Sequence, residues 1–207
     1  MMLKQYFAQQ LGKPSGLIGK WFLGPLWNWR NMALNDLTLT HLDLQVNDRV
    51  LDVGFGGGYL LAKIIPMVRG GLAAGVDISP VMVENARMRW CEAIQAGQVI
   101  LESAPIESLP FHEESFNKIS SVNSIFYWAD VRKGMTEIYR CLCSGGLVVL
   151  TFTCEQDLQK KWFIPYGARP YPVAEVQNML AHTGFRGILI YQGVDRHRKF
   201  TCIKAIK

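Results

Sequence analysis

The 207-residue sequence lacks long apolar runs: the longest, such as GGLVVLTF at 145–152, fall far short of the about 20 residues that a membrane helix needs. The N-terminus also lacks an apolar stretch followed by a small-residue cleavage site, which argues against a signal peptide. Hydrophobic residues make up 49% of the chain and charged residues 19%, a balance that argues against disorder. We therefore expect a soluble, cytoplasmic protein whose length suits one sizeable core.

Cysteines are few, and their spacing matches no common zinc pattern. The five lie at Cys91, Cys141, Cys143, Cys154 and Cys202. An odd number favours reduced, buried thiols over a disulfide framework. Cys141 and Cys143 alone would make an incomplete site for a soft metal, so we expect no metal.

Dense basic patches are also scarce, although the formal net charge is +5. The basic residues are scattered, except in the stretch DRHRK at 195–199, where Phe200 is the only adjacent aromatic residue. A solvated turn is the simpler reading of that stretch. We therefore expect no nucleic-acid partner.

The chain has no internal repeat, and its pattern changes near residue 46. Residues 1–45 predict a helical extension, with helical stretches at 2–11 and 30–44. Residues 46–207 predict strands alternating with helices, which is typical of an α/β fold with a doubly wound, mostly parallel seven-stranded sheet. The last two strands, 185–192 and 199–206, are joined by a short turn, so the last strand should run antiparallel, as a reversed edge strand.

The expected strands and helices of this part can be assigned from apolar runs and from start and stop signals. The other strands are expected at 49–54, 72–78, 98–103, within 115–125 and at 145–152. The helices are expected at 59–68, 80–96, 131–142 and 172–184, with Ser79 as an N-cap and Gly97 as a stop. In such sheets a ligand binds at the carboxyl ends of the strands.

A glycine-rich turn follows the first strand in VLDVGFGGGYL, residues 50–60. Glycine permits positive φ and lets a ligand approach the backbone closely. A dinucleotide fingerprint starting at Gly54 would need its third glycine at Tyr59, which is too bulky for close helix packing. A phosphate-binding P-loop is excluded because no Gly-Lys-Ser/Thr follows.

An acid, Asp77, ends the second strand. A carboxylate at this place can accept hydrogen bonds from both ribose hydroxyls and would repel a 2′-phosphate. The alternative is an acid that only caps the next helix. The turn and the acid together indicate a nucleoside site without a diphosphate.

Four segments in order resemble the class I S-adenosylmethionine-dependent methyltransferases: residues 50–60, 75–87, 102–130 and 137–152. The similarity extends over about 46–206, and the subgroup it resembles most is the small-molecule type that includes quinone C-methyltransferases. It implies these contacts to S-adenosylmethionine: Asp52, Gly54 and Gly56 around the methionine part, Asp77 on the ribose, Ile78 on the adenine face, Ser103 and Ala104 at the adenine edge, and Asn123 near the methionine end and the acceptor. Ser103 stands where many relatives have an aspartate, and a hydroxyl is the weaker acceptor. Asn123 has an alternative role as a strand-end residue that bonds its own loop.

Methyl transfer needs alignment of nucleophile, methyl and sulfur and exclusion of water, and it needs a base only if the acceptor is protonated. Aromatic segments at 125–128 and 162–171 should overhang the strand ends, which suits an apolar or aromatic acceptor, although core packing also explains them. Two catalytic candidates follow: Tyr127, to orient an acceptor hydroxyl, and His112, in a loop expected beside the site. Neither is a convincing base.

The segment rich in glycine and tryptophan, residues 12–31, has three interpretations. The first is a lid with glycine hinges, and the second is an interfacial anchor in which Trp21 and Trp27 enter lipid beside basic residues. The third is a helix packed on the sheet.

The leading function is methyl transfer from S-adenosylmethionine to a small organic molecule. The alternatives are a quinone or lipid-ring C-methyltransferase at the membrane surface and a cofactor-binding scaffold without catalysis. A nucleic-acid methyltransferase is disfavoured because an NPPY-like motif is absent after the fourth strand.

Overall fold

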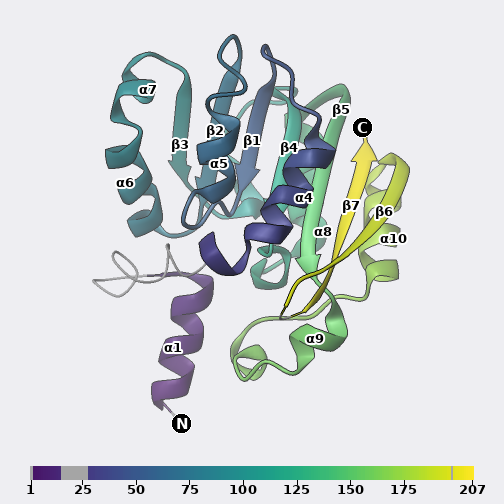
Figure 1. Ribbon diagram of the computed structural model, residues 1–207. Helices are drawn as coiled ribbons and strands as arrows, with labels where there is room; N and C mark the ends of the chain where they lie inside the picture. The colour runs from purple at the N-terminus through teal and green to yellow at the C-terminus, as the bar shows by residue number, and fades with distance from the viewer. Residues whose placement is uncertain (1, 15–27, 197) are drawn as a thin grey trace.

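The computed structural model describes residues 2–14, 28–196 and 198–207, which build a seven-stranded sheet with helices on both faces (Figure 1). In chain order the strands are β1 (Arg49–Val53), β2 (Leu72–Asp77), β3 (Val99–Ser103), β4 (Phe116–Val122), β5 (Leu142–Thr153), β6 (Arg186–Val194) and β7 (Lys199–Ile206). Their spatial order is β3-β2-β1-β4-β5-β7-β6. Strands β1 to β5 pair in parallel, and β7 is antiparallel to both of its neighbours. The predicted doubly wound α/β sheet with an antiparallel last strand is confirmed.

The expectation that the reversed strand lies at the edge is wrong. Strand β7 lies between β5 and β6, and β6 is the edge. The side chains explain the order. β7 is apolar on both faces, with Cys202, Ile203 and Ala205 fully buried, whereas every residue of β6 is exposed or only partly buried. Of the two strands of a hairpin, the one that is apolar on both faces gains more from the interior position.

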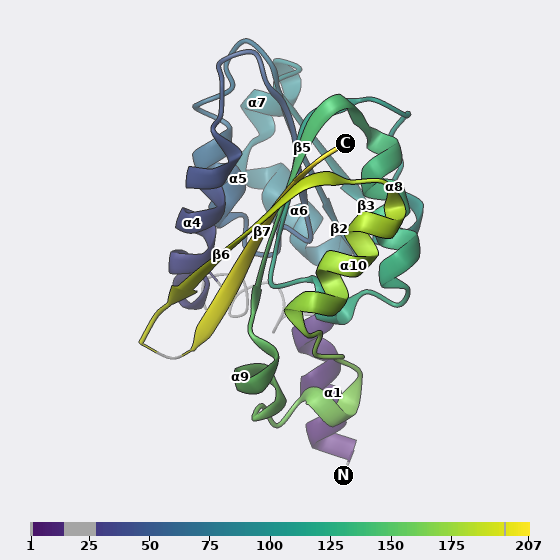
Figure 2. The same ribbon diagram turned by 90° about the vertical axis from the view of Figure 1, so that its right-hand side faces the viewer.

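Helices cover the sheet in two layers (Figure 2). The helices are α1 (Met2–Gly12), α4 (Met32–Leu42), α5 (Tyr59–Ile64), α6 (Pro80–Arg89), α7 (Cys91–Gln95), α8 (Val131–Cys141), α9 (Glu155–Gln159) and α10 (Val173–Thr183), with 3₁₀ turns η2 (Ile106–Ser108), η3 (Ile125–Tyr127) and η4 (Ile164–Tyr166). The helix expected at 80–96 is divided at Trp90 into α6 and α7. Ser79 caps α6 as predicted, because its Oγ accepts a hydrogen bond from the Met82 N–H at 3.4 Å.

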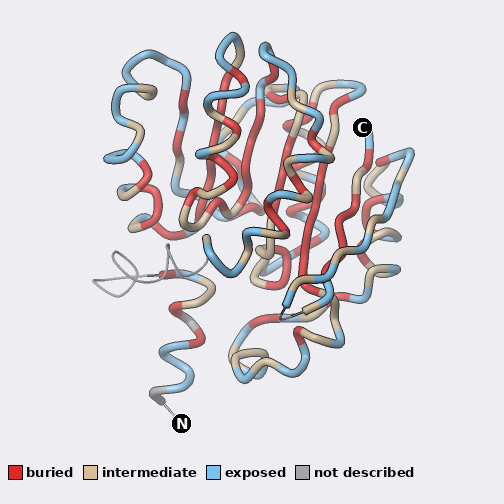
Figure 3. Tube along the Cα trace, in the orientation of Figure 1, coloured by how far each residue is buried: buried red, intermediate tan, exposed pale blue. Residues whose placement is uncertain are grey.

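The core lies on both sides of the sheet because successive strand residues point to opposite faces. In β1, Val50 packs in the layer of α4, α5 and α6, while Leu51 and Val53 pack in the layer of α8 and α10. Figure 3 shows the strands as the most continuously buried part of the chain. This rigid centre positions the loops at the strand ends.

The two described helices of residues 1–45 occupy different places. Helix α4 packs against β4, β5 and β7, whereas α1 extends beyond the carboxyl ends of the parallel strands and contacts η4 (Figure 1). Trp21 and Trp27 lie outside the described residues. Within the part of the chain that the structure describes, no helix is both long and apolar enough to span a membrane.

Candidate functional site

A cavity of about 630 Å³ opens at the carboxyl edge of the sheet. The last residues of β1 and β2, Val53 and Asp77, line it together with Val122 of β4 and Thr153 of β5. This is the place that a doubly wound sheet offers a ligand, and the volume falls within the roughly 300–1,000 Å³ of small-molecule sites.

The glycine-rich turn forms one wall and needs its glycines. Gly54, Gly56 and Gly58 all have positive φ, at 71°, 53° and 75°. A Cβ on Gly54 would lie 2.7 Å from the Ser124 Cβ, and one on Gly58 would lie 2.6 Å from the Trp90 ring. The chain therefore turns directly from β1 into α5, and its backbone lines the cavity at Gly54 and Gly56.

Asp77 holds this turn and faces the cavity. Its Oδ2 accepts a hydrogen bond from the Gly56 N–H at 2.9 Å, and its Oδ1 accepts one from the Ser79 N–H at 2.8 Å. Burial raises the pKa of Asp77, while these two bonds act to lower it. A carboxylate oxygen accepts more than one hydrogen bond, so both oxygens keep acceptor capacity for a ligand. Ile78, which is 41% exposed and lines the cavity, offers an apolar surface beside them.

A second buried acid, Asp52, lies in the same wall. Its Oδ1 accepts a hydrogen bond from the Ser120 Oγ at 2.9 Å. Burial raises the pKa of Asp52 to about 7, and the charge of Asp77 adds to the rise. Two neighbouring buried acids favour a cationic ligand, because a positive charge would compensate the cost of ionising both.

Only one of the two residues predicted at the adenine edge lies in the site. Ala104 lines the cavity, but Ser103 is exposed and does not. Ser103 ends β3, the outermost strand, so its side chain is open to solvent. The expectation that Ser103 contacts the ligand is not supported by its position.

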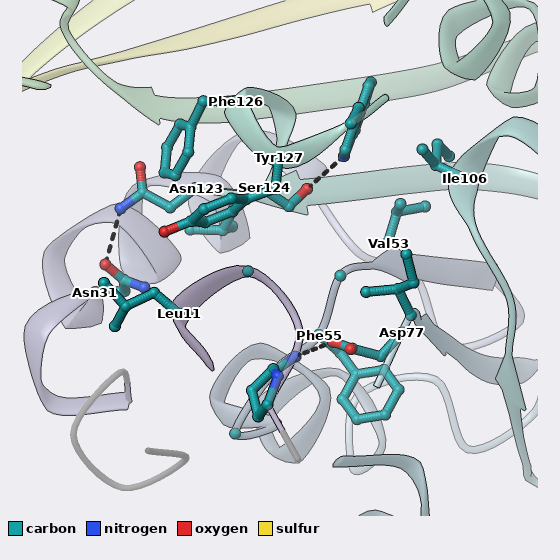
Figure 4. A pocket seen from close by; sticks show the side chains of 18 of the residues that line it. Leu11, Asn31, Val53, Phe55, Asp77, Ile106, Asn123, Ser124, Phe126 and Tyr127 are labelled. Atoms are coloured by element: carbon teal, nitrogen blue, oxygen red, sulfur yellow. Dashed lines mark hydrogen bonds between the residues drawn. The ribbon is translucent and has the colours of Figure 1, made fainter. Parts of the chain in front are cut away.

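Aromatic and aliphatic side chains form the opposite wall (Figure 4). They come from η3 and the residue after it, from α9 and the chain that follows it, and from α1, and are Phe126, Tyr127, Trp128, Leu158, Trp162, Phe163 and Leu11. The Tyr127 ring lies 4.7 Å from the Phe126 ring and 6.4 Å from the Phe163 ring, centre to centre. Both predicted aromatic segments contribute to the cavity lining, the second only through Trp162 and Phe163, while Phe126 also belongs to the hydrophobic core. These rings make the wall suited to an apolar ring.

Within this wall, the Tyr127 ring lies against the end of α1. A Cβ on Gly12 would lie 2.9 Å from the Tyr127 ring, so α1 approaches the tyrosine as closely as glycine allows. Burial raises the pKa of Tyr127. Its hydroxyl has no hydrogen bond within the described ranges and stays a neutral phenol, which can donate a hydrogen bond but is no base.

Asn123 lines the cavity, and its side chain connects three segments. The backbone of Asn123 has φ of 53°. Its Oδ1 accepts from the Thr153 N–H and Oγ at 2.8 and 3.0 Å, and its Nδ2 donates to the Asn31 Oδ1 at 2.8 Å (Figure 4). The amide therefore joins the ends of β4 and β5 to the start of α4, in a structural role wider than a bond within its own loop.

The prediction that His112 lies beside the site is wrong. His112 is exposed, precedes β4 and is not among the residues that line the cavity. The chain after η2 must return to the other edge of the sheet before a parallel strand can begin. His112 lies on this return, whereas the cavity lies where β4 ends.

Arg198 is one of several polar residues of the cavity wall that the sequence analysis did not identify; others include Asn28, Arg30, Asn31, Glu107 and Lys161. Arg198 lies at the turn between β6 and β7, and its Nη2 donates to the Asn31 Oδ1 at 2.8 Å. Its only signal in the sequence is the basic stretch at 195–199, which by itself predicts a solvated turn.

The segment before α4 is attached to the glycine-turn wall at two points. The Ser79 Oγ donates to the Pro14 carbonyl at 2.6 Å, and the Asn28 Nδ2 donates to the Gly57 carbonyl at 3.1 Å. Residues 14 and 28 therefore both contact the wall that Asp77 organises.

Comparison with known proteins identifies the fold. Residues 51–150 match the family described as "Methyltransferase domain". An uncharacterized methyltransferase, YdaC of Bacillus subtilis, is 32% identical over 121 residues, which are 58% of this chain and 65% of that protein. The ubiquinone/menaquinone biosynthesis C-methyltransferase UbiE of a Geobacter species is 32% identical over 123 residues, 59% of this chain and 50% of that protein.

A solved structure of a SAM-dependent methyltransferase from Aquifex aeolicus is similar to nearly the whole chain. It has a TM-score of 0.66 and 18% identity, and the match covers 98% of this chain and 97% of that one. The sequence matches to the two bacterial relatives extend over half to about two thirds of their lengths, 50% and 65%.

Proposed function

Because the chain belongs to the class I S-adenosylmethionine-dependent methyltransferases, we propose that it transfers a methyl group from S-adenosylmethionine to a small apolar or aromatic molecule. The observation that carries this proposal is Asp77, a buried carboxylate at the end of β2 that is held by two backbone N–H groups and faces the cavity. The cofactor would lie along the wall of Asp52, Gly54, Gly56 and Asp77. The acceptor would lie against the aromatic wall.

The residues present fit this cofactor. Asp77 has acceptor capacity for two ribose hydroxyls, Ile78 offers an apolar face to an adenine, and the turn at Gly54 has no side chain in the way. The acids Asp52 and Asp77 suit a positively charged ligand. When bound, S-adenosylmethionine supplies a methyl group that its positive sulfur has already activated.

The protein itself would position the acceptor against the methyl group and exclude water from the site. The aromatic wall presents ring faces, which attract a nearby positive charge. Tyr127, as a neutral phenol, would donate a hydrogen bond to an oxygen of the acceptor and so fix its orientation. Among the described residues that line the cavity there is no histidine or cysteine. The carboxylates Asp52 and Asp77 lie in the cofactor wall rather than in the aromatic wall, so the acceptor that we propose is one that needs little help from a base, such as an electron-rich ring carbon or an ionised oxygen.

The test has two parts. Calorimetry with S-adenosylhomocysteine should show one site per chain, and labelled methyl from S-adenosylmethionine should enter the small-molecule fraction of a cell extract rather than its lipid or RNA fractions. No binding of either adenosyl compound would overturn the proposal. Tight binding without any transfer would favour the scaffold alternative.

A second candidate is C-methylation of a quinone ring at a membrane surface. It is favoured by the relative named for ubiquinone and menaquinone biosynthesis and by aromatic side chains near the cavity, since Tyr6 and Phe7 of α1 and Trp29 are 46%, 43% and 62% exposed. Label in the lipid fraction, together with co-sedimentation with anionic liposomes that is lost on substitution of Trp21 and Trp27, would support it.

We also propose that residues 1–45 act as a cap over the cofactor. The bonds from Ser79 to Pro14 and from Asn28 to Gly57 support this role. Deletion of residues 1–30 should raise the dissociation constant of S-adenosylhomocysteine. An unchanged dissociation constant would contradict the proposed cap and would favour the hypothesis of a membrane anchor.

A further inference from the structure

The charged residues that line the cavity are separated by sign. Within the described chain there are six: the acids Asp52, Asp77 and Glu107 and the bases Arg30, Lys161 and Arg198. The acids lie at the ends of β1 and β2 and after β3. Lys161 follows α9, beyond β5, and Arg198 adjoins β7. Because the sheet order is β3-β2-β1-β4-β5-β7-β6, the two signs fall on opposite halves of the sheet.

Arg198 is the most deeply buried of the three bases, with 9% of its side chain exposed. Its Nη2 donates to two neutral oxygens, the Arg30 carbonyl and the Asn31 Oδ1. Its Nε is buried and makes no hydrogen bond within the described ranges. This Nε forms an ion pair at 3.5 Å with Asp195 Oδ2, so that end of the guanidinium already faces a carboxylate. The Nη1 group has no hydrogen bond within the described ranges, and a buried guanidinium donor is costly unless a partner completes it.

The other two bases add to the positive charge. Lys161 and Arg30 form no ion pair among the described residues, and residues 15–27 contain no acidic residue. Burial lowers the pKa of Arg198, Asp195 acts to raise it, and the nearby charge of Arg30 lowers it further. Two acids lie near these bases, Asp195 beside Arg198 and Asp157, which pairs with Lys160, but neither lines the cavity, so the lining of this half is positive.

We propose, on the basis of the proposed methyl transfer, that the acceptor carries an oxyanion, either a carboxylate or a phosphate, and that Arg198 and Lys161 bind it. The Nη1 group of the guanidinium can donate a charged hydrogen bond to such a group, and the lysine suits its charge. The acidic half takes the cationic cofactor and the basic half takes the anionic end of the acceptor. The aromatic wall between them holds the body of the acceptor.

The test compares three ring compounds on the full chain saturated with S-adenosylhomocysteine: 4-hydroxybenzoate, phenyl phosphate and the neutral 4-hydroxybenzyl alcohol. Trp128 and Trp162 line the cavity, so quenching of tryptophan fluorescence reports binding. We expect at least one anion to bind about tenfold tighter than the alcohol, with a preference that weakens as salt is raised. Whichever anion binds tighter identifies the source of the oxyanion.

Three variants locate the effect. Arg198→Gln should remove most of the preference for the anion, Lys161→Gln should reduce it about threefold, and Arg132→Gln, on the exposed side of α8, should leave it unchanged. Lys161→Gln keeps the test valid if Arg198→Gln fails to fold, because no hydrogen bond of the Lys161 side chain holds the described structure together.

Two results would overturn the inference. The first is a neutral ring that binds as well as both anions, or no binding of either anion. The second is a loss of affinity for S-adenosylhomocysteine in Arg198→Gln with the anion preference intact, which would assign this base to the amino-acid end of the cofactor. If the unmodified protein fails to bind S-adenosylhomocysteine at all, the proposed function fails instead, while the anion preference can still be measured on the unloaded protein.

Discussion

The two halves of the cavity differ in how many parts of the chain they need. The acidic half comes almost entirely from one continuous segment, residues 52–78, which holds Asp52, the glycine turn and Asp77. The aromatic and basic half combines α1, the chain before α4, η3, the chain after α9 and the turn before β7. The first half is local in sequence and therefore recognisable as a motif, whereas the second half exists only once distant segments have packed together.

This contrast fits the roles that we propose for the two halves. A shared cofactor can be held by a shared motif, and an acceptor that differs between relatives is held by loops that are free to vary. Substitutions in the acidic half should therefore act on cofactor affinity, and substitutions in the other half should act on the acceptor.

The largest expected effect is that of Asp77→Ala. The variant loses the bonds to the Gly56 and Ser79 N–H groups as well as the proposed bonds to the ribose, and charged hydrogen bonds contribute about 1.5–3 kcal/mol each. Calorimetry should show affinity for S-adenosylhomocysteine reduced by a factor of about 100 or more. Glu84→Ala, on the exposed surface of α6, is the matched control. An unchanged affinity of Asp77→Ala for S-adenosylhomocysteine would contradict the proposal that the acidic half binds the cofactor.

The next effect concerns pH and Asp52. Because burial raises the pKa of Asp52 to about 7, the folded protein binds this proton at pH values where the unfolded chain, with a pKa near 3.8, has lost it. The stabilisation that comes from protonated Asp52 is therefore fully present below about pH 4. As the pH rises through 7 it is lost, and the free energy of unfolding falls by at most roughly 4 kcal/mol. Urea unfolding across this range should show the fall in the wild type.

Asp52→Asn keeps an acceptor for Ser120 but cannot ionise, so it should lack this fall. The difference between the two proteins isolates Asp52 from carboxylates such as Glu137, whose pKa is lowered by its bonds to Arg140. Parallel pH curves for both proteins would contradict a raised pKa at Asp52.

A smaller effect is expected in the aromatic half from Tyr127→Phe. The Tyr127 hydroxyl makes no hydrogen bond within the described ranges, so its removal should leave both stability and affinity for S-adenosylhomocysteine unchanged. Transfer to the acceptor should fall by roughly tenfold, the size of one lost hydrogen bond. Kinetics with labelled cofactor give the transfer rate. A loss of cofactor affinity instead would show that the two halves are not separable at this residue.

The smallest effect should come from Asn28→Ala. This change removes one hydrogen bond, 3.1 Å long, from the cap to the Gly57 carbonyl. The dissociation constant of S-adenosylhomocysteine should rise two- to threefold, about half a kcal/mol. Asn178→Ala, on α10 far from the cavity, should not change it. No change in Asn28→Ala would argue that this bond contributes nothing to a cap.

The places at which the structure differs from the sequence-based expectations have one origin. His112 and Ser103 are close in sequence to residues of the site, yet the first lies on the return to the far edge of the sheet and the second lies on the outermost strand. The sequence likewise does not determine whether β6 or β7 lies next to β5, because a hairpin can attach to a sheet through either strand. In each case the missing information was which strand neighbours which.

The local chemistry of residues 50–80 was sufficient to predict a tight glycine turn, an acid at the end of the next strand and a capped helix after it, because each depends on backbone preferences within a few residues. Arg198 could not be found in this way. A guanidinium in a basic turn is solvated unless the fold brings partners such as the Arg30 carbonyl and Asn31 against it. Burial, and with it the need of a charge for a partner, arises only from packing between segments that are far apart in the chain.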